Sequence, residues 1–151
     1  MPFPIVQALL ASIATAQVGA AGFHETLRAA DARLAAIGHR LATANVGLCD
    51  RLQPATGLVT HALGQYGAGE RDAARRAFEF ESPVAVEAVV EGAAADRGGV
   101  RPDEGLVAVN GAVVGGGQDG TGDRDRALDL LESGRPAAPI TLSLRRGGAT
   151  A

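Results

Sequence analysis

The sequence contains no tryptophan, no lysine and only 3% aromatic residues. Hydrophobic residues nevertheless make up 46% of the chain, so a core must be built mainly from Ala, Val and Leu. A chain of 151 residues typically buries about 70% of its unfolded surface, which is enough for one ordinary domain or two small ones. We therefore expect a folded protein of modest stability.

The charge balance argues against a nucleic-acid partner. The formal net charge is −3, and all 14 basic residues are arginines. These arginines do not form a cluster; only Arg71, Arg75 and Arg76 and the pair Arg145-Arg146 come close to one. Binding to nucleic acid requires a basic face, and the sequence predicts none.

Residue types that carry catalysis are few and lie in no recognisable motif. Cys49 is the only cysteine, which excludes an internal disulfide and argues against a Cys-based metal site. His24, His39 and His61 belong to no ligand or triad pattern, and no serine lies in a nucleophile elbow. We therefore predict that the protein is not an enzyme and has no catalytic residue, no metal site and no cofactor.

The N-terminal segment PIVQALLASIATA, residues 4–16, is apolar but too short to span a bilayer as a helix. Ala14-Thr15-Ala16 before Gln17 fits a signal-peptidase site, so residues 1–16 are predicted to be a cleaved signal peptide. The mature protein would then be periplasmic or secreted, with no membrane span; without a signal it would be cytoplasmic. The first residues carry no Lys or Arg, so the alternative is an N-terminal helix that packs on the next one.

The clearest helical pattern falls within a predicted helical region, residues 17–75. Leucines recur there every seven residues, with Ala or Ile between them: Leu27, Ala30, Leu34, Ile37, Leu41, Ala44 and Leu48. Two interpretations follow. An amphipathic helix packed within its own chain, in a monomer, is favoured because Gly38 and Gly47 weaken an isolated coil. The alternative is a short coiled coil from Leu27 to Leu48, which would make the protein a self-associating scaffold.

The stretch from Val84 to Val114 predicts a complete supersecondary unit. A valine-rich strand ends at Gly92, and one helical turn follows that Gly98-Gly99 terminates. A second strand then leads into Asn110-Gly111, the dipeptide that most easily forms a type I′ hairpin.

The run GAAADRGGVRPDEGLVAVNG in this unit resembles a PDZ domain of the bacterial protease-associated type. The similarity continues through the predicted helix DRDRALDLLESG and the predicted strand PITLSLRRGG, and covers residues 76–148. It implies an α+β fold, in which an N-terminal helical segment precedes a small PDZ-like, partly open β-barrel with two helices.

The same resemblance implies a noncatalytic module that binds a peptide or protein segment, such as a C-terminus, and that associates with or regulates an envelope protease. The peptide would pair with a strand beginning at Phe78 and rest against a helix from Arg124 to Ser133. The carboxylate-binding loop of PDZ domains, x-Φ-G-Φ, matches Phe78-Glu79-Phe80 at both aromatics, with Glu79 in place of glycine. The predicted peptide-binding residues are Arg76, Phe78, Glu79, Phe80, Leu128 and Leu131. An alternative is that the two phenylalanines belong to a strand with one buried face.

The N-terminal half has a second resemblance. The runs RLATANVGLC and HALGQYG are similar to the leading region of bacterial exported zinc metallopeptidases. The chain has no H-E-x-x-H motif, since Arg28 stands where the second histidine after His24-Glu25 would be. The resemblance therefore implies a noncatalytic part, or a fragment, of such a protease.

Overall fold

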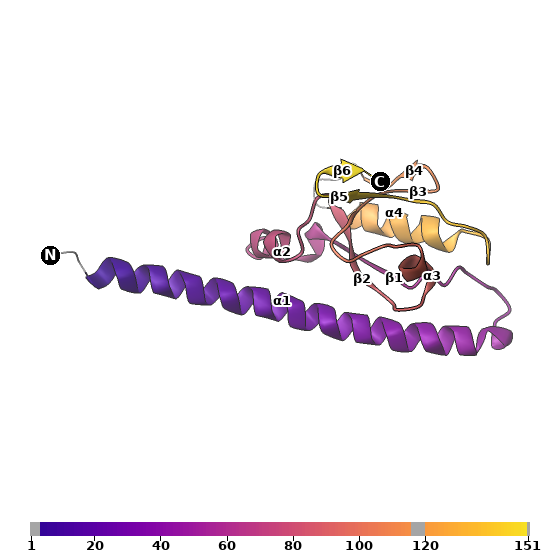
Figure 1. The fold of residues 1–151 in the computed structure, drawn as a ribbon, viewed down its shortest axis with the longest axis horizontal. Helices are drawn as coiled ribbons and strands as arrows, with labels where there is room; N and C mark the ends of the chain where they lie inside the picture. Colours follow the sequence, from indigo (N-terminus) through magenta and orange to yellow (C-terminus); the bar gives the residue numbers. More distant parts are fainter. Residues whose placement is uncertain (1–3, 116–119, 151) are drawn as a thin grey trace.

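The computed structural model describes residues 4–115 and 120–150 of the chain. It is an α+β structure, with one long N-terminal helix followed by a six-stranded antiparallel open sheet and a further helix packed on it (Figure 1). The elements are α1 (Pro4–Ala44), η1 (Val46–Leu48), β1 (Leu58–Ala62), η2 (Leu63–Gln65), α2 (Arg71–Ala77), β2 (Val84–Val89), α3 (Ala94–Arg97), β3 (Gly105–Val109), β4 (Ala112–Val113), α4 (Thr121–Glu132), β5 (Leu142–Arg146) and β6 (Ala149–Thr150). The predicted α+β class is confirmed, and closure of the sheet into a PDZ-like barrel stays a prediction.

Helix α1 is the longest element and runs along the sheet domain, then projects beyond it toward the N-terminus (Figure 1). The part of the predicted heptad pattern from Leu27 to Ala44 is helical, as expected, and lies in the second half of α1. Residues 4–16 of the predicted signal segment belong to the same helix, and residues 1–3 lie outside the described residues.

The face of α1 that packs on the domain is not its leucine face. Residues at helical spacing are buried or half-buried there: His24, Arg28, Asp31, Ala32, Ala35, Ala36 and His39. By contrast, Leu34 is 68% exposed and Leu41 is 61% exposed. The prediction that the leucine face packs within its own chain is therefore wrong. The face in contact carries small and polar side chains that fit around aromatic rings of the domain.

The sheet has the strand order β1-β2-β3-β5-β6, with β4 paired to β3. Strand β1 lies within residues 17–75, the region predicted to be helical, so the sheet begins before residue 76. Strand β2 is buried on both faces, which explains its continuous apolar run rather than a polar alternation. The prediction of a strand starting at Phe78 is wrong, because Phe78 is the C-cap of α2 and the strand starts at Val84.

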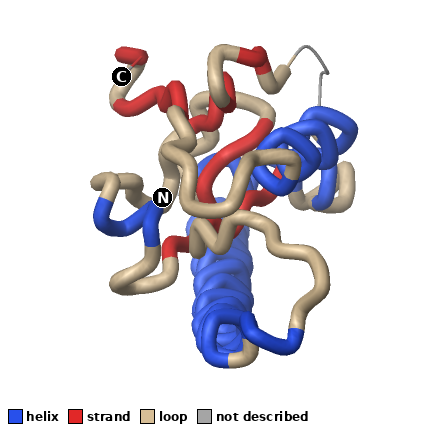
Figure 2. Tube along the Cα trace, turned by 90° about the vertical axis from the view of Figure 1, so that its right-hand side faces the viewer, coloured by secondary structure: helices blue, strands red, loops and turns tan. Residues whose placement is uncertain are grey.

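The core lies between the sheet and α4, which covers the face opposite to α1 (Figure 2). Its buried residues are Val84, Val86, Leu106, Val109, Val114, Ala127, Leu131 and Leu144. None is aromatic, so the predicted aliphatic composition of this core is confirmed.

The turns of the Val84–Val114 unit form as predicted. Asn110 and Gly111 both have positive φ, 51° and 78°, as a type I′ hairpin requires. Helix α3 ends at Gly98 and is followed by Gly99 at φ 80°. Helix α4 begins at Thr121, after the N-cap Gly120, and so starts three residues before the predicted Arg124.

Candidate functional site

Strand β1 forms one edge of the sheet, since it pairs only with β2. Gly57 introduces the strand with φ 72°, and its carbonyl accepts a hydrogen bond from the Val90 N–H at 2.8 Å. A Cβ at Gly57 would lie 2.2 Å from the Cβ of Ala93, so only glycine fits this position. The backbone N–H and C=O groups of successive residues in a strand point to opposite sides of the strand. Since the carbonyl of Gly57 points toward β2, the N–H and C=O groups of Leu58 point away from it.

Side chains of the same chain bond to this outer edge. Three bonds do so: Leu58 N–H to Thr56 Oγ1 (3.3 Å), Arg124 Nε to the Thr60 carbonyl (3.0 Å), and Ala62 N–H to Gln65 Oε1 (2.6 Å). An unpaired edge strand is a template for another chain, and proteins commonly cover it in this way. Any strand added here would have to displace Arg124 from Thr60.

A groove of about 440 Å³ lies beside the start of β1. Leu58 forms part of its wall, and Leu128 and Leu131 of α4 form the facing part. The C-terminal end of α1, including His39 and Ala42, supplies a third wall. The groove is therefore bordered by α1 but not filled by it.

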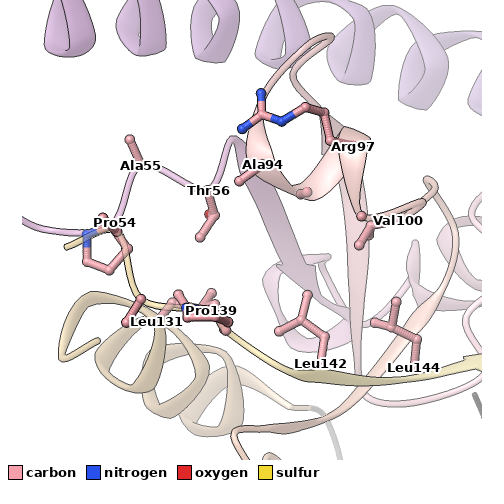
Figure 3. A pocket seen from close by; sticks show the side chains of 15 residues that line it. Pro54, Ala55, Thr56, Ala94, Arg97, Val100, Leu131, Pro139, Leu142 and Leu144 are labelled. Atoms are coloured by element: carbon pink, nitrogen blue, oxygen red, sulfur yellow. The ribbon is translucent and has the colours of Figure 1, made fainter. Parts of the chain in front are cut away.

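A second cavity of about 580 Å³ lies next to this groove (Figure 3). Both are lined by the segment 54–56 and by Leu131. Most of its remaining lining is aliphatic, including Val100, Ile140 and Leu142. A small apolar side chain that enters beside Leu131 would find an apolar environment on either side.

The six predicted peptide-binding residues do not come together. Leu128 and Leu131 line the groove beside β1. Arg76 and Glu79 are exposed at the end of α2, where Glu79 has φ 44°. Phe78 is only 1% exposed, and Phe80 is half-buried. Both side chains lie on the face of the sheet that is opposite to α4.

Phe78 and Phe80 belong to a cluster of rings between α1 and the sheet. This ring cluster contains all four aromatic residues of the described part of the chain and two histidines: Phe23, His24, His61, Tyr66, Phe78 and Phe80. His61 stacks on Phe80 with a centroid distance of 4.5 Å. Aromatic contacts of this kind add to the burial of apolar area, so the ring cluster holds α1 on the domain.

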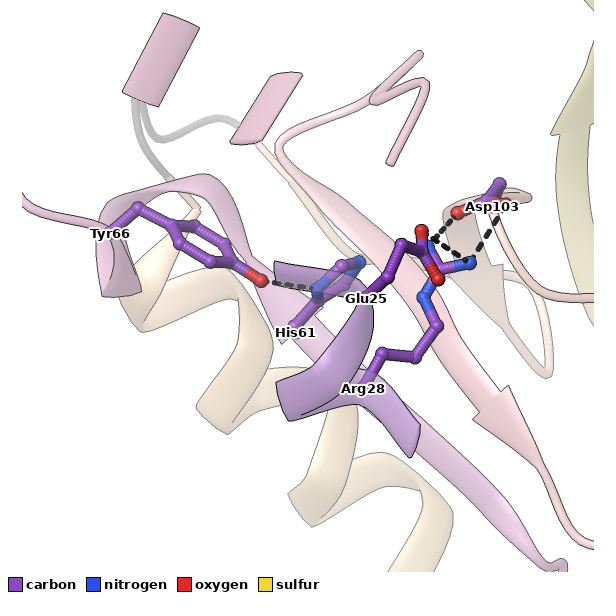
Figure 4. A network of polar contacts seen from close by, with 5 residues as sticks. All are labelled: Glu25, Arg28, His61, Tyr66 and Asp103. Carbon is purple, nitrogen blue, oxygen red and sulfur yellow. Dashed lines mark hydrogen bonds and ion pairs between the residues drawn. The ribbon is translucent and has the colours of Figure 1, made fainter. Parts of the chain in front are cut away.

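His61 is a buried, neutral member of the ring cluster. Its Nδ1 lies 2.8 Å from Tyr66 Oη (Figure 4). Burial, followed by the positive charges of Arg28 and Arg124, lowers the pKa of His61 to about 3. Burial also raises the pKa of Tyr66, with Glu87 adding to the shift. Neither group is charged at neutral pH.

Arg28 connects α1 to the loop before β3. Its guanidinium binds both carboxylate oxygens of Asp103 (Figure 4). Its Cζ also lies 4.4 Å from the ring centroid of Phe78. On the same helix, Glu25 Oε1 lies 3.8 Å from Arg28 Nη1. Sequence reasoning missed this contact because Arg28 and Asp103 are separated by 75 residues and neither lies in a motif.

Within residues 4–115 and 120–150, no group of three or more His, Cys, Asp or Glu side chains is arranged to hold a metal ion. No helix in this part of the chain combines the length and apolar character that a membrane span requires. No family model matches the chain, and neither a curated protein nor a solved structure matches it. The PDZ and metallopeptidase resemblances therefore stay predictions.

Proposed function

We propose that the protein is a noncatalytic binding module that takes an extended peptide against the outer edge of β1, alongside α4. The observation that carries the proposal is the combination of an edge strand and a groove at its start. In strand addition, backbone hydrogen bonds supply affinity and side-chain pockets supply specificity. It is also the mode that the PDZ resemblance implies, with β1 in place of a strand at Phe78.

The groove supplies the apolar contacts that such a peptide needs. Leu58, Leu128 and Leu131 line it from two elements, and the adjoining cavity is mostly aliphatic. Alternate side chains of an extended peptide point to the same side. One apolar side chain would therefore enter beside Leu131, and the next on that side would lie along α4.

The edge is open to pairing only after a rearrangement. The Arg124 side chain bonds the Thr60 carbonyl, which an added strand would use. A hydrogen bond from a charged group contributes about 1.5–3 kcal/mol, so its displacement lowers the affinity for a peptide. Arg124 therefore protects the edge from nonspecific pairing and sets a threshold for a specific ligand.

Selection from a displayed library of random peptides with free C-termini tests this proposal. A selected peptide is then titrated by fluorescence anisotropy against the full chain and against Leu128→Glu, which places a charge in the groove. We expect Leu128→Glu to weaken binding at least about tenfold, equivalent to about 1.4 kcal/mol. Val113→Glu is the matched control, because Val113 is 60% exposed and does not line the groove.

The amidated form of the same peptide separates two versions of the proposal. Preference for the free carboxylate indicates capture of a C-terminus, and equal affinity indicates binding of an internal segment. If the library yields no binder, or if Leu128→Glu binds as well as the parent protein, the proposal is wrong.

A second candidate function is self-association through the leucine face of α1. The observation that favours it is exposure: on α1, Leu27, Leu34, Ile37 and Leu41 are 44%, 68%, 41% and 61% exposed, and Leu48, which follows in η1, is 83% exposed. Since the opposite face packs on the sheet domain, these residues are free to contact a second copy. Heptad spacing of apolar residues is typical of helix pairing.

A further inference from the structure

The apolar heptad pattern of α1 also extends toward the N-terminus from Leu27. Counting back from Leu27 and Ala30 in steps of seven adds six residues, all of them apolar: Val6, Leu9, Ile13, Ala16, Ala20 and Phe23. Because α1 is one continuous helix of 41 residues, these positions extend the leucine face along its whole length. We call this face, from Val6 to Ala44, the seam. It spans nearly six heptads, whereas about three to four already indicate a coiled coil.

The sheet domain leaves the seam open wherever its side chains are described. Phe23 is 62% exposed, much like Leu34 and Leu41. The domain packs instead on the flank beside the seam, where His24 is buried and Asp31 is half-buried. A second helix can therefore reach the seam without displacing the domain.

The N-terminal half of α1 is the part that most needs an apolar partner. Residues 4–22 contain no charged side chain and no histidine, and most of them are apolar. This half projects beyond the sheet domain (Figure 1). Helices with so little polar surface are normally covered. A second copy of the chain offers an apolar seam of equal length.

The seam is complementary to itself when two copies run antiparallel. In an antiparallel pair, the residues of one heptad row lie opposite those of the other row. If Phe23 lies opposite Leu27 of the second copy, every seam residue of one helix lies opposite a seam residue of the other. The match continues through Leu9 opposite Leu41 and ends with Val6 opposite Ala44, so that the two helices overlap over their full length.

The antiparallel arrangement also fills space more evenly than a parallel one. A parallel pair would place alanine opposite alanine at each of the seam alanines: Ala16, Ala20, Ala30 and Ala44. The antiparallel pair does so only where Ala20 meets Ala30, because Ala16 then faces Leu34. Gaps at alanine levels between wide leucine levels are unfavourable, since apolar contacts prefer close packing.

The charged flank of the seam favours the same orientation. Arg33 and Arg40 are exposed and directly precede the seam residues Leu34 and Leu41. In a parallel pair, this flank would lie against the flank of the second helix that carries Asp31, which the second copy's own domain covers. In an antiparallel pair, the two arginine flanks lie together, and each arginine faces the uncharged half of the other helix.

We propose that two copies of the chain pair through the whole of α1 as an antiparallel coiled coil. This inference rests on the second candidate function, self-association, and adds its orientation and extent. Residues 4–16 would belong to the interface, which corresponds to the alternative that the N-terminal helix packs on the next one, here in the second copy. The two grooves, each bordered by His39 and Ala42, would lie at opposite ends of the pair. One dimer would then hold two separate peptides.

Distance measurement between spin labels tests the orientation. Arg40→Cys carries the label in a Cys49→Ser chain, since Cys49 is the only cysteine and is exposed. In the antiparallel pair, residue 40 lies level with residue 10 of the second helix. The two labels are then about 30 residues, or about 45 Å, apart along the axis. A parallel pair would bring them within about 20 Å, because paired helices lie about 8–10 Å apart.

Thr26→Cys in the same Cys49→Ser chain is the matched control. Residue 26 lies near the middle of the antiparallel overlap, so its label gives a short distance in either orientation and reports only that the dimer has formed. We expect the long distance from residue 40 and the short distance from residue 26, at a protein concentration where sedimentation velocity shows a dimer. Short distances from both labels overturn the antiparallel arrangement and leave self-association standing. A monomer with no distance from either label overturns both.

Discussion

Arg124 Nε donates a hydrogen bond to the backbone carbonyl of Thr60 at 3.0 Å and so connects α4 to the edge strand β1. The two residues are 64 positions apart in the sequence. The carbonyl that Arg124 holds is one that a paired strand would require. This contact therefore couples the fold of the domain to access to its proposed binding edge.

Removing this contact is expected to strengthen peptide binding. Arg124→Ala frees the Thr60 carbonyl, and we expect the affinity for a selected peptide to rise by about tenfold, because a charged hydrogen bond no longer has to be broken. Arg126→Ala is the control, since Arg126 Nε bonds the Val113 carbonyl away from the edge. Fluorescence anisotropy with both variants measures the effect; an unchanged or lower affinity of Arg124→Ala would show that Arg124 does not guard the edge.

The exposed leucine face predicts that the parent protein forms dimers at high micromolar concentration. Leu34→Glu combined with Leu41→Glu should yield a monomer in sedimentation velocity, because each buried leucine contributes about 1.5–3 kcal/mol to an interface. Ala29→Glu adds a charge to α1 at an exposed position off the leucine face and serves as the control. A parent protein that stays monomeric over the same range excludes this second function.

Arg28 is expected to be the most important single residue for holding α1 on the domain. Arg28→Ala removes the bidentate bond to Asp103 and the contact with the Phe78 ring, and should lower the free energy of unfolding by about 2–3 kcal/mol. Arg28→Lys should not restore it, since lysine lacks the planar fork. A double-mutant cycle with Asp103→Asn, measured by urea unfolding, isolates the pair; asparagine tolerates the φ of 70° at this position. Additive effects would contradict a direct coupling.

The titration of His61 predicts a loss of stability in acid. Its pKa is about 3 in the folded protein and 6.5 in the unfolded chain, so the unfolded state binds more protons between these values. The contribution of His61 is complete above pH 6.5 and is lost as the pH falls toward about 3, with a slope of at most about 1.4 kcal/mol per pH unit. The free energy of unfolding, measured with urea over this pH range, should fall less steeply with decreasing pH for His61→Phe than for the parent protein. Equal slopes would mean that His61 does not titrate as its burial implies.

Glu87 acts in the opposite direction. Its folded pKa is raised, so its contribution to stability is complete below the unfolded pKa and is lost as the pH rises through the folded pKa. Glu87→Gln should therefore make the stability rise more steeply with pH than in the parent protein.

Two glycines should respond to alanine in opposite ways. Gly57→Ala meets the Ala93 Cβ and a φ of 72°, and should cost at least about 2 kcal/mol of the free energy of unfolding. Gly38→Ala, within α1 and with nothing within 4 Å of the added Cβ, should stabilise the protein by about 0.5–1 kcal/mol. Thermal unfolding compares the two; a tolerated Gly57→Ala would mean that the segment before β1 can relax.

Much of the secondary structure could be predicted because its signals are local. Asn110-Gly111 specifies a hairpin, Gly98-Gly99 ends α3, and the apolar period of α1 marks a helix wherever it packs. The long-range relationships carry no such signal. The leucine pattern identifies an apolar face but not whether the same chain covers it.

The candidate site illustrates the same limit. Leu128 and Leu131 could be found from the periodicity of α4, whereas the partner strand could not. Two phenylalanines near residue 79 favoured a strand there, but Phe78 ends α2 and packs under α1. The edge strand follows Gly57, and only the pairing of Leu58–Ala62 with β2 identifies it.

The most direct test is amide NMR of the isotope-labelled chain during titration with a selected peptide. Strand addition at β1 predicts that the largest chemical-shift changes fall on the amides of residues 57–60, and that the Thr60 amide becomes protected from hydrogen exchange. Changes along α2 and residues 78–80, with the β1 amides unaffected, would contradict it.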